Sequence, residues 1–299
     1  MNMQTKIHCK PKAGYEIAAP ERVISRSCLK PDCGQCFGLC CVALYFSAGE
    51  GFPVDKEAGK PCIHLQPDFR CRVHDQLADK ALKGCLTFDC FGAGQKVSQV
   101  TFKGKDWLQA PAYAVPMFDA FSIMRQLHEM LWLLIEALAL PSAGPIHGGI
   151  HSLLIETENL TFLGAEAVLT LDLAAHREKV SRILLEASEL ERTNVRSSAG
   201  SSAARKKVLR PGADWIGADL RKYDLRGISL RGACLIAADL RGADLTGTDL
   251  IGADLRDADL CGTNLTKSLF LTQAQINGAK GDIDTRLPDS LETPAHWNN

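Results

Sequence analysis

Residues 213–270 read ADWIG ADLRK YDLRG ISLRG ACLIA ADLRG ADLTG TDLIG ADLRD ADLCG TNLTK SLF, a pattern with a strict period of five. A period of five matches neither the 3.6-residue turn of a helix nor the two-residue alternation of a strand. A coil with five-residue sides can keep the central apolar residue and the small residue two places before it buried in every unit. The central residues are Trp215, Leu220, Leu225, Leu230, Leu235, Leu240, Leu245, Leu250, Leu255, Leu260, Leu265 and Phe270.

These units resemble the pentapeptide-repeat family, A(D/N)LXX, over about residues 212 to 282. The resemblance implies a right-handed quadrilateral β-helix with four repeats per coil. Leu and Ala then face inward, and stacking at about 4.8 Å lets each coil bury the face of the next one. Tyr223 and Ile228 replace the small residue in two adjacent units, which predicts a distorted interior near the start of the stack. A preceding domain is expected to dock there.

The residues after Phe270 carry the signals of a short helix that covers the end of the stack. Thr272 and Gln275 form a capping-box pair, and Gly281 follows as a stop. The pattern predicts a helix over 273–280, because the last coil of a repeat stack needs a cap. The stretch that follows it has the composition of an extended strap.

The middle of the chain, residues 96–192, is helical by pattern. Apolar residues recur at intervals of three and four between Pro116 and Pro141, which predicts a buried amphipathic helix. A second helix is predicted over 175–192, and a segment over 150–158 is expected to pack with both.

The next stretch, residues 193–211, loses this periodicity and holds five basic residues and no acidic one, so it is predicted to be a linker. The predicted organisation is an N-terminal arm over 1–27, a cysteine-rich metal-binding domain over 28–95, the helical region over 96–192, the basic linker over 193–211, the pentapeptide-repeat β-helix over 212–272, and a capping helix and tail over 273–299.

The chain has 12 cysteines, and nine of them fall between residues 28 and 90. The N-terminus lacks the apolar run of a signal peptide, and the longest apolar stretch, residues 130–140, is shorter than the roughly 20 residues of a membrane span. We therefore expect a cytoplasmic protein without a membrane anchor. In a reducing compartment, clustered thiols are more often metal ligands or catalytic groups than disulfides.

Close cysteine pairs separated by longer loops make this cluster a candidate metal site, because two ligands from one tight turn span one edge of a tetrahedral site. Between residues 28 and 90 the seven Lys and Arg are roughly balanced by eight Asp and Glu. The negative charge of packed thiolates would therefore be uncompensated without a bound cation. Zinc, iron or an iron–sulfur cluster is predicted, and copper also suits thiolates. The candidate ligands are Cys33, Cys36, Cys40, Cys41, Cys62, Cys71, Cys85 and Cys90, together with His64 and His74.

The same region resembles the CxxCxxCC family of zinc- or iron-chelating domains over about residues 28–95. Three residues rather than two separate Cys36 from the adjacent cysteine pair, which is a departure from the family pattern. The matching features are Cys33 and Cys36, the pair Cys40 and Cys41, the stretch from Cys62 to Cys71 with His74, and the closing Cys85 and Cys90. Together with the helices and the repeats, this gives a multidomain fold with a loop-rich cysteine domain, an α-helical middle and a β-helix.

Other interpretations of the thiols and histidines stay open. The cysteines could be partly free reactive groups or disulfides, and His64 or His74 could be an ordinary surface histidine. His147 and His151 stand four residues apart, but no carboxylate or cysteine lies near them in sequence. His128 lies beside an apolar stripe, as core histidines do. The chain contains no G-x-S-x-G, Walker or H-E-x-x-H motif.

The sequence thus predicts a cytoplasmic metal-binding protein whose repeat domain is a scaffold or a platform for a protein or peptide partner. An alternative is a redox metalloenzyme that uses iron or copper to modify a peptide, a protein or a small molecule, so enzymatic activity stays an open question. A third is a DNA-mimic inhibitor of gyrase, which the nine Asp against seven Lys and Arg over residues 212–270 disfavour. A net charge of −1 gives no reason to expect a nucleic-acid or membrane partner.

Overall fold

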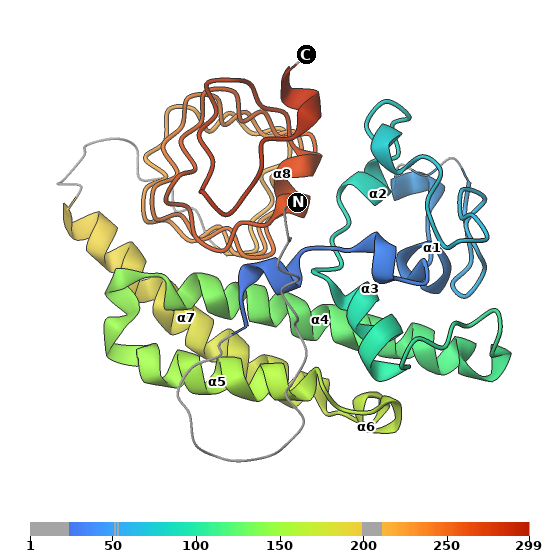
Figure 1. The fold of residues 1–299 in the computed structure, drawn as a ribbon. Coiled ribbons are helices and arrows are strands. Elements are labelled where there is room, and N and C mark those ends of the chain that lie inside the picture. The colour runs from blue at the N-terminus through green and yellow to red at the C-terminus, as the bar shows by residue number, and fades with distance from the viewer. Residues whose placement is uncertain (1–23, 51, 53, 199–210, 299) are drawn as a thin grey trace, which may run out of the picture.

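The computed structural model describes residues 24–50, 52, 54–198 and 211–298. Figure 1 shows a loop-rich cysteine region and a stack of coils lying side by side, with a group of helices below both. The arm predicted over 1–27 lies outside the described residues except for its last four, and most of the linker predicted over 193–211 lies outside them as well.

The middle region is helical, as predicted, and its elements pack around α4 (Ala114–Leu138). The helices α5 (His147–Leu160), α6 (Ala165–Leu169) and α7 (Leu173–Ser198) all contact α4. The start of α4 lies before Pro116 rather than after it, because a helix tolerates proline in its first turn, where the missing N–H has no intrahelical partner.

The last of these helices, α7, continues six residues into the predicted linker, to Ser198. Arg196 in this extension and Arg192 just before it have a partner on the repeat stack: Arg192 Nε and Arg196 Nη1 donate to the Gly227 carbonyl at 3.1 and 3.2 Å. The extension is therefore held by tertiary contacts, which local sequence composition does not reveal.

The cysteine region consists of short elements joined by loops. Its α-helices are α1 (Leu39–Ala43), α2 (Lys83–Leu86) and α3 (Ala93–Lys96), and a π-helical turn, η5 (Val97–Thr101), follows directly. The 3₁₀ turns are η1 (Arg26–Leu29), η2 (Cys33–Gln35), η3 (Ala48–Glu50), η4 (His74–Gln76), η6 (Pro111–Tyr113) and η7 (Pro141–Ile146), the last two being on the helical side.

Residues 213–270 form stacked coils in which residues 20 apart lie in register. Parallel bridges join Asp219 to Asp239 and Asp239 to Asp259, and the Leu220 N–H donates to the Asp239 carbonyl at 2.9 Å. The bridge that this register would place between Asp224 and Asp244 is missing from the described residues, next to the irregular unit at Tyr223.

The expected β-helix needs one correction. The bridges of the repeat stack are isolated, and the part of the chain that the structure describes contains no strand. Each five-residue side spends two residues on a turn, which leaves a single extended residue to pair with the next coil. The repeat region is therefore a stack of turns joined by single bridges.

The end of the stack is covered by α8 (Gln273–Gly278), whose predicted capping box between Thr272 and Gln275 is present. The tail then folds back as a 3₁₀ turn, η8 (Ala295–Asn298), rather than ending as an extended strap. Its Trp297 donates from Nε1 to the Ala279 carbonyl at 2.9 Å, and its ring is buried. The buried ring and its hydrogen bond hold this turn against the residues that follow α8.

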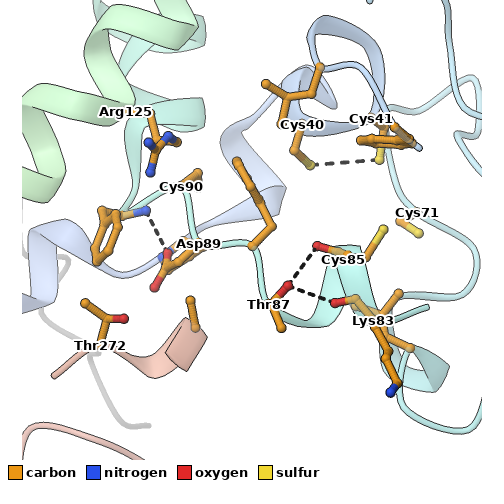
Figure 2. A pocket seen from close by; sticks show the side chains of 18 of the residues that line it. Cys40, Cys41, Cys71, Lys83, Cys85, Thr87, Asp89, Cys90, Arg125 and Thr272 are labelled. Carbon is orange, nitrogen blue, oxygen red and sulfur yellow. Dashed lines mark hydrogen bonds between the residues drawn. The ribbon is translucent and has the colours of Figure 1, made fainter. Parts of the chain in front are cut away.

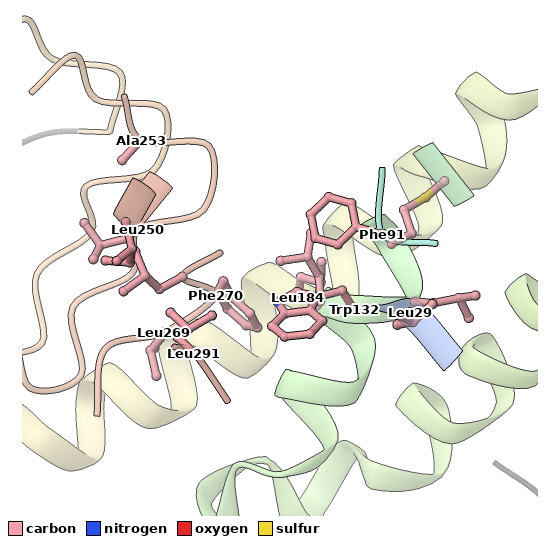
Figure 3. Packing of buried hydrophobic residues seen from close by; sticks show 14 of the residues in the cluster. Leu29, Phe91, Trp132, Leu184, Leu250, Ala253, Leu269, Phe270 and Leu291 are labelled. Carbon is pink, nitrogen blue, oxygen red and sulfur yellow. The ribbon is translucent and has the colours of Figure 1, made fainter. Parts of the chain in front are cut away.

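One apolar core joins the repeat stack to the helices. Figure 3 shows Phe270 at the end of the repeats next to Leu184 of α7 and Trp132 of α4, with Phe91 and Leu29 of the cysteine region beyond them. Among the described residues no single helix is long and apolar enough to cross a membrane. Taken together, α4 and α5 with their preceding turns have the length and composition, but the pair is bent by 109°.

Candidate metal centre

A cavity of about 820 Å³ lies where the three regions meet. The cysteine region forms one wall, Arg125 and Glu129 of α4 form the second, and residues 252–256 with residues 272–275 of the repeat side contribute the third. Figure 2 shows Cys40, Cys41, Cys71 and Cys85 on one side of this cavity, and Cys90 with Arg125, Asp89 and Thr272 on the other. Seven candidate cysteines line it: Cys33, Cys36, Cys40, Cys41, Cys71, Cys85 and Cys90.

The adjacent pair Cys40 and Cys41 is presented by α1, which begins after a glycine in the left-handed conformation. Gly38 has a φ of 66°, and a methyl group there would lie 2.6 Å from Leu65 Cδ1. A larger residue would therefore be strained and would clash with the loop that carries Cys71. The tight turn before α1 is what lets thiols from both segments face the same cavity.

Cys41 hydrogen-bonds with both Cys40 and Cys71, and the Cys40 and Cys41 sulfurs lie 3.9 Å apart. These hydrogen bonds lower the pKa of Cys40, lower the pKa of Cys71 to about 6, and raise the pKa of Cys41. Cys71 is therefore mostly a thiolate at neutral pH, and Cys40 loses its proton more readily than an ordinary cysteine. Two thiolates bound to one zinc ion at 2.3 Å stand about 3.8 Å apart, so the observed separation suits a shared tetrahedral ion.

Cys36 and Cys90 form a second pair around Gly94 of α3. A methyl group at Gly94 would lie 2.6 Å from the Cys36 sulfur, and the Gly94 N–H is a hydrogen-bond donor to Cys90. Burial raises the pKa of Cys36 to about 11 and that of Cys90 to about 12. These two thiols are therefore neutral without a cation, and a bound cation would be needed to deprotonate them.

Cys85 on α2 lies between the main cavity and a smaller one of about 100 Å³. Burial raises the pKa of Cys85 to about 12. The smaller cavity is lined by Cys62, His64 and Cys85, so Cys62 and His64 share a cavity with Cys85 but not with the other six cysteines. The Cys62-x-His64 spacing looks like other ligand pairs in sequence, but neither residue lines the main cavity.

The two candidate histidines differ in position. His74 lines the main cavity, and its Nδ1 lies 3.5 Å from Asp75 Oδ1. Arg72 Nε donates to His64 Nδ1 at 3.2 Å, which leaves that ring nitrogen without a proton. Burial, followed by Arg72, lowers the pKa of His64. Of the two, His74 is the one placed to join the seven cysteines.

Sequence reasoning missed the polar residues that complete the cavity. Arg125 Nη1 pairs with Glu129 Oε2 at 3.4 Å on α4, and Arg256 pairs with Asp254 at 2.6 Å on the repeat stack. Burial raises the pKa of Asp89, which lies next to Cys90. The arginines and their partners follow the local pattern of their helix or repeat, and Asp89 lies in a loop, so no signal in the sequence marks these residues as part of a site.

Within the described residues, no group of three or more His, Cys, Asp or Glu side chains already stands in metal-binding geometry. The chemistry of the donor atoms indicates which metals the main cavity would suit. Soft thiol sulfurs predominate among the candidate donors of the main cavity, which suits zinc, iron–sulfur clusters and Cu(I) better than the hard cations magnesium or calcium. The free cysteines Cys234 and Cys261 lie apart, in the repeat stack.

Comparison with known protein families identifies the C-terminal part. The pentapeptide-repeat family matches residues 229–266 and 243–280, with eight copies. A crystal structure of a pentapeptide repeat protein from the Arabidopsis thaliana thylakoid lumen is 27% identical, covering 32% of this chain and 68% of that chain with a TM-score of 0.18.

The relationship to a second protein extends over nearly the whole sequence. The chain is 55% identical over 269 residues to the uncharacterized protein YybG of Bacillus subtilis (strain 168), covering 90% of this chain and 95% of the relative. The chain therefore belongs to the same family as YybG, and its C-terminal part consists of pentapeptide repeats.

Proposed function

We propose that this protein binds zinc or iron through its cysteine cluster, with iron held as a single ion or in an iron–sulfur cluster. The observation that carries the proposal is the convergence of seven thiols on one cavity from segments around residues 33–41, 71 and 85–90. A reducing cytoplasm, which the sequence leads us to expect, would keep these thiols available as ligands.

The first ligands are expected to be Cys40, Cys41 and Cys71, because their sulfurs interact directly and two of them carry a lowered pKa. Cys36 and Cys90 are the next candidates, since a cation would offset the cost of deprotonating buried thiols. When bound, a metal would supply positive charge, and iron or copper would also supply redox chemistry.

The repeat stack serves in this proposal as a scaffold and as a platform for a protein or peptide partner. Several of its outward Asp side chains are paired with arginine: Arg241 lies 2.7 Å from Asp239 and 3.7 Å from Asp259, so one arginine bridges two coils. Paired charges support a scaffold better than they support imitation of the uniformly negative surface of DNA.

Metal analysis tests the proposal directly. The full chain is purified without oxygen, and zinc, iron and copper are measured together with the visible spectrum. A double variant, Cys36→Ser with Cys40→Ser, is expected to lose most of the bound metal, whereas Cys234→Ser in the repeat stack is expected to retain it. Undiminished metal in the double variant would overturn the assignment, and a colourless protein with stoichiometric zinc would exclude the iron–sulfur version.

A second candidate function, a redox metalloenzyme acting on a peptide, a protein or a small molecule, is favoured by the size of the cavity. Structural zinc sites are closed by four protein ligands, whereas catalytic sites keep an open position, and 820 Å³ is within the range of ligand-binding cavities. Adding cyanide or imidazole to cobalt-loaded protein checks this. A change in the cobalt spectrum supports an open position, and an unchanged spectrum supports a closed structural site.

A further inference from the structure

The short helix that carries Cys85 is attached to the repeat stack on both sides of this cysteine. Lys83 Nζ lies 2.8 and 2.9 Å from the two carboxylate oxygens of Asp257, and Asn277 Nδ2 donates to the Leu86 carbonyl at 3.3 Å. Figure 2 shows Lys83, Cys85 and Thr87 on this one segment at the edge of the cavity. The two contacts connect α2 to the repeats and to α8 immediately before and after the thiol.

Helix α2 has little stability of its own. It spans only four residues, and Leu82 at its N-cap makes no side-chain cap. The ring of Phe52 also packs against α2, so closely that a methyl group on Gly84 would lie 2.1 Å from Phe52 Cε2. The place of Cys85 is thus set by tertiary contacts on two sides rather than by local helix formation.

Asp257 is an exception within the repeats. It takes a φ of 59° at the last position of its five-residue unit, where most units have a glycine with positive φ. A non-glycine residue adopts this conformation at an energetic cost. The side chain of Asp257 is otherwise free of partners among the described residues, and Lys83 is the group that it binds. The carboxylate therefore serves the contact with α2 rather than the coil itself.

We infer that Asp257 is a positioning residue, through which the repeat stack holds Lys83 and thereby fixes the Cys85 thiol at the cavity. This inference rests on the proposed metal function, and it gives the repeats a direct part in building the site. The ion pair is partly exposed, with 57% of the Lys83 and 41% of the Asp257 side chain accessible. Its effect is accordingly expected to be moderate and to weaken with salt.

The test uses Asp257→Gly in the full chain, which removes the carboxylate and also relieves the backbone strain. The matched control is Ala237→Gly, 20 residues earlier in the same column, where φ is 55° and the side chain is exposed. We expect Asp257→Gly to bind zinc about 3- to 5-fold more weakly at low salt and to change the cobalt spectrum, as a partly exposed ion pair allows. Ala237→Gly should bind like the wild type.

Two further measurements separate positioning from a merely structural role. Exchanging the charges, Lys83→Asp with Asp257→Lys, should restore the affinity and the spectrum. Raising the salt concentration should reduce the difference between the wild type and Asp257→Gly. Weakened binding that neither the exchange nor salt alters would overturn the inference.

A last measurement keeps this inference distinct from the metal proposal. In metal-free protein, the rate of alkylation of Cys85 by iodoacetamide is followed by mass spectrometry. Loss of the Lys83 contact should accelerate alkylation of Cys85 several-fold in Asp257→Gly and leave Cys234 unchanged. If the wild type binds no metal but Cys85 responds in this way, the metal function fails and the positioning role stands. If Cys85 does not respond, the positioning role fails.

Discussion

Ser188 of α7 donates a 2.6 Å hydrogen bond to Asp249, a carboxylate in the repeat stack whose side chain is completely buried. Arg231 Nη1 lies 3.0 Å from the same carboxylate oxygen. This buried ion pair and hydrogen bond connect the helical region to the middle coil. Since a buried charge needs partners, the contact fixes how α7 lies against the repeats.

Asp249→Ala is therefore expected to destabilise the protein by about 3 kcal/mol, because it leaves Arg231 and Ser188 without their partner in a buried position. The free energy of unfolding in urea measures the loss. The control is Asp244→Ala, one repeat earlier on an exposed position, which should cost about 1 kcal/mol or less. Similar losses in both variants would contradict the assigned role of Asp249.

A second contact between α7 and the stack depends on glycine. Gly247 has a φ of 67°, and a methyl group there would lie 2.6 Å from Val195 Cγ2, whereas Gly242 has a φ of 66° and open space around it. Gly242→Ala should cost about 1 kcal/mol from backbone strain alone, and Gly247→Ala should cost about 1 to 3 kcal/mol more from overlap.

Thermal or urea unfolding of the two glycine variants measures this difference. Val195→Ala provides the internal check, because removing the methyl groups that overlap should recover most of the additional loss in a double variant with Gly247→Ala. A double variant that is no more stable than Gly247→Ala would show that α7 does not lie against this turn.

The repeat stack and its cap could be predicted from sequence because each five-residue unit repeats the same pattern of small and apolar residues. The central leucines, the small residue before them and the capping box of Thr272 and Gln275 all act over a few residues. The absence of strands could not be inferred from the period alone. It follows from hydrogen bonding, since only one residue per side, such as Asp239, pairs with its neighbours 20 residues away.

The candidate site could be predicted only in its chemistry. Cysteine spacing indicated thiol ligands, but it could not show that Cys62 and His64 line a different cavity from Cys71. The spacing also gave no sign of Arg125 or Arg256, because these residues reach the cavity through the packing of regions far apart in sequence. Tertiary contacts, not local patterns, decide which side chains meet.

Adding zinc to metal-free protein should raise the melting temperature if the cluster binds the ion in the folded state. At 100 times the dissociation constant the stabilisation is about 2.7 kcal/mol, or a rise of roughly 5 °C for a chain of this size. Cys71→Ser should abolish most of the rise, since its thiol hydrogen-bonds with Cys41 at the cavity. Cys234→Ser in the repeat stack should leave it intact, and an equal rise in both variants would count against binding at the cluster.

Stability should also depend on the protonation of His128, which is buried on α4 and has its Nδ1 2.7 Å from the Phe91 carbonyl. Burial lowers the pKa of His128 to about 4, with Lys96 acting in the same direction. Because the folded-state pKa lies below the value near 6.5 of an unfolded histidine, the neutral ring stabilises the fold fully above pH 6.5. That stability is lost as the pH falls from 6.5 through 4, by up to about 3 kcal/mol.

Urea unfolding of the wild type and of His128→Gln between pH 7 and pH 4 isolates this contribution, because all other titrating groups are shared. Glutamine can still donate a hydrogen bond to the Phe91 carbonyl, but it cannot gain a proton. The stability of the wild type should therefore fall more steeply than that of the variant below pH 6.5, and the two curves should run parallel above pH 7. Parallel curves across the whole range would show that His128 is protonated as readily in the folded protein as in the unfolded chain.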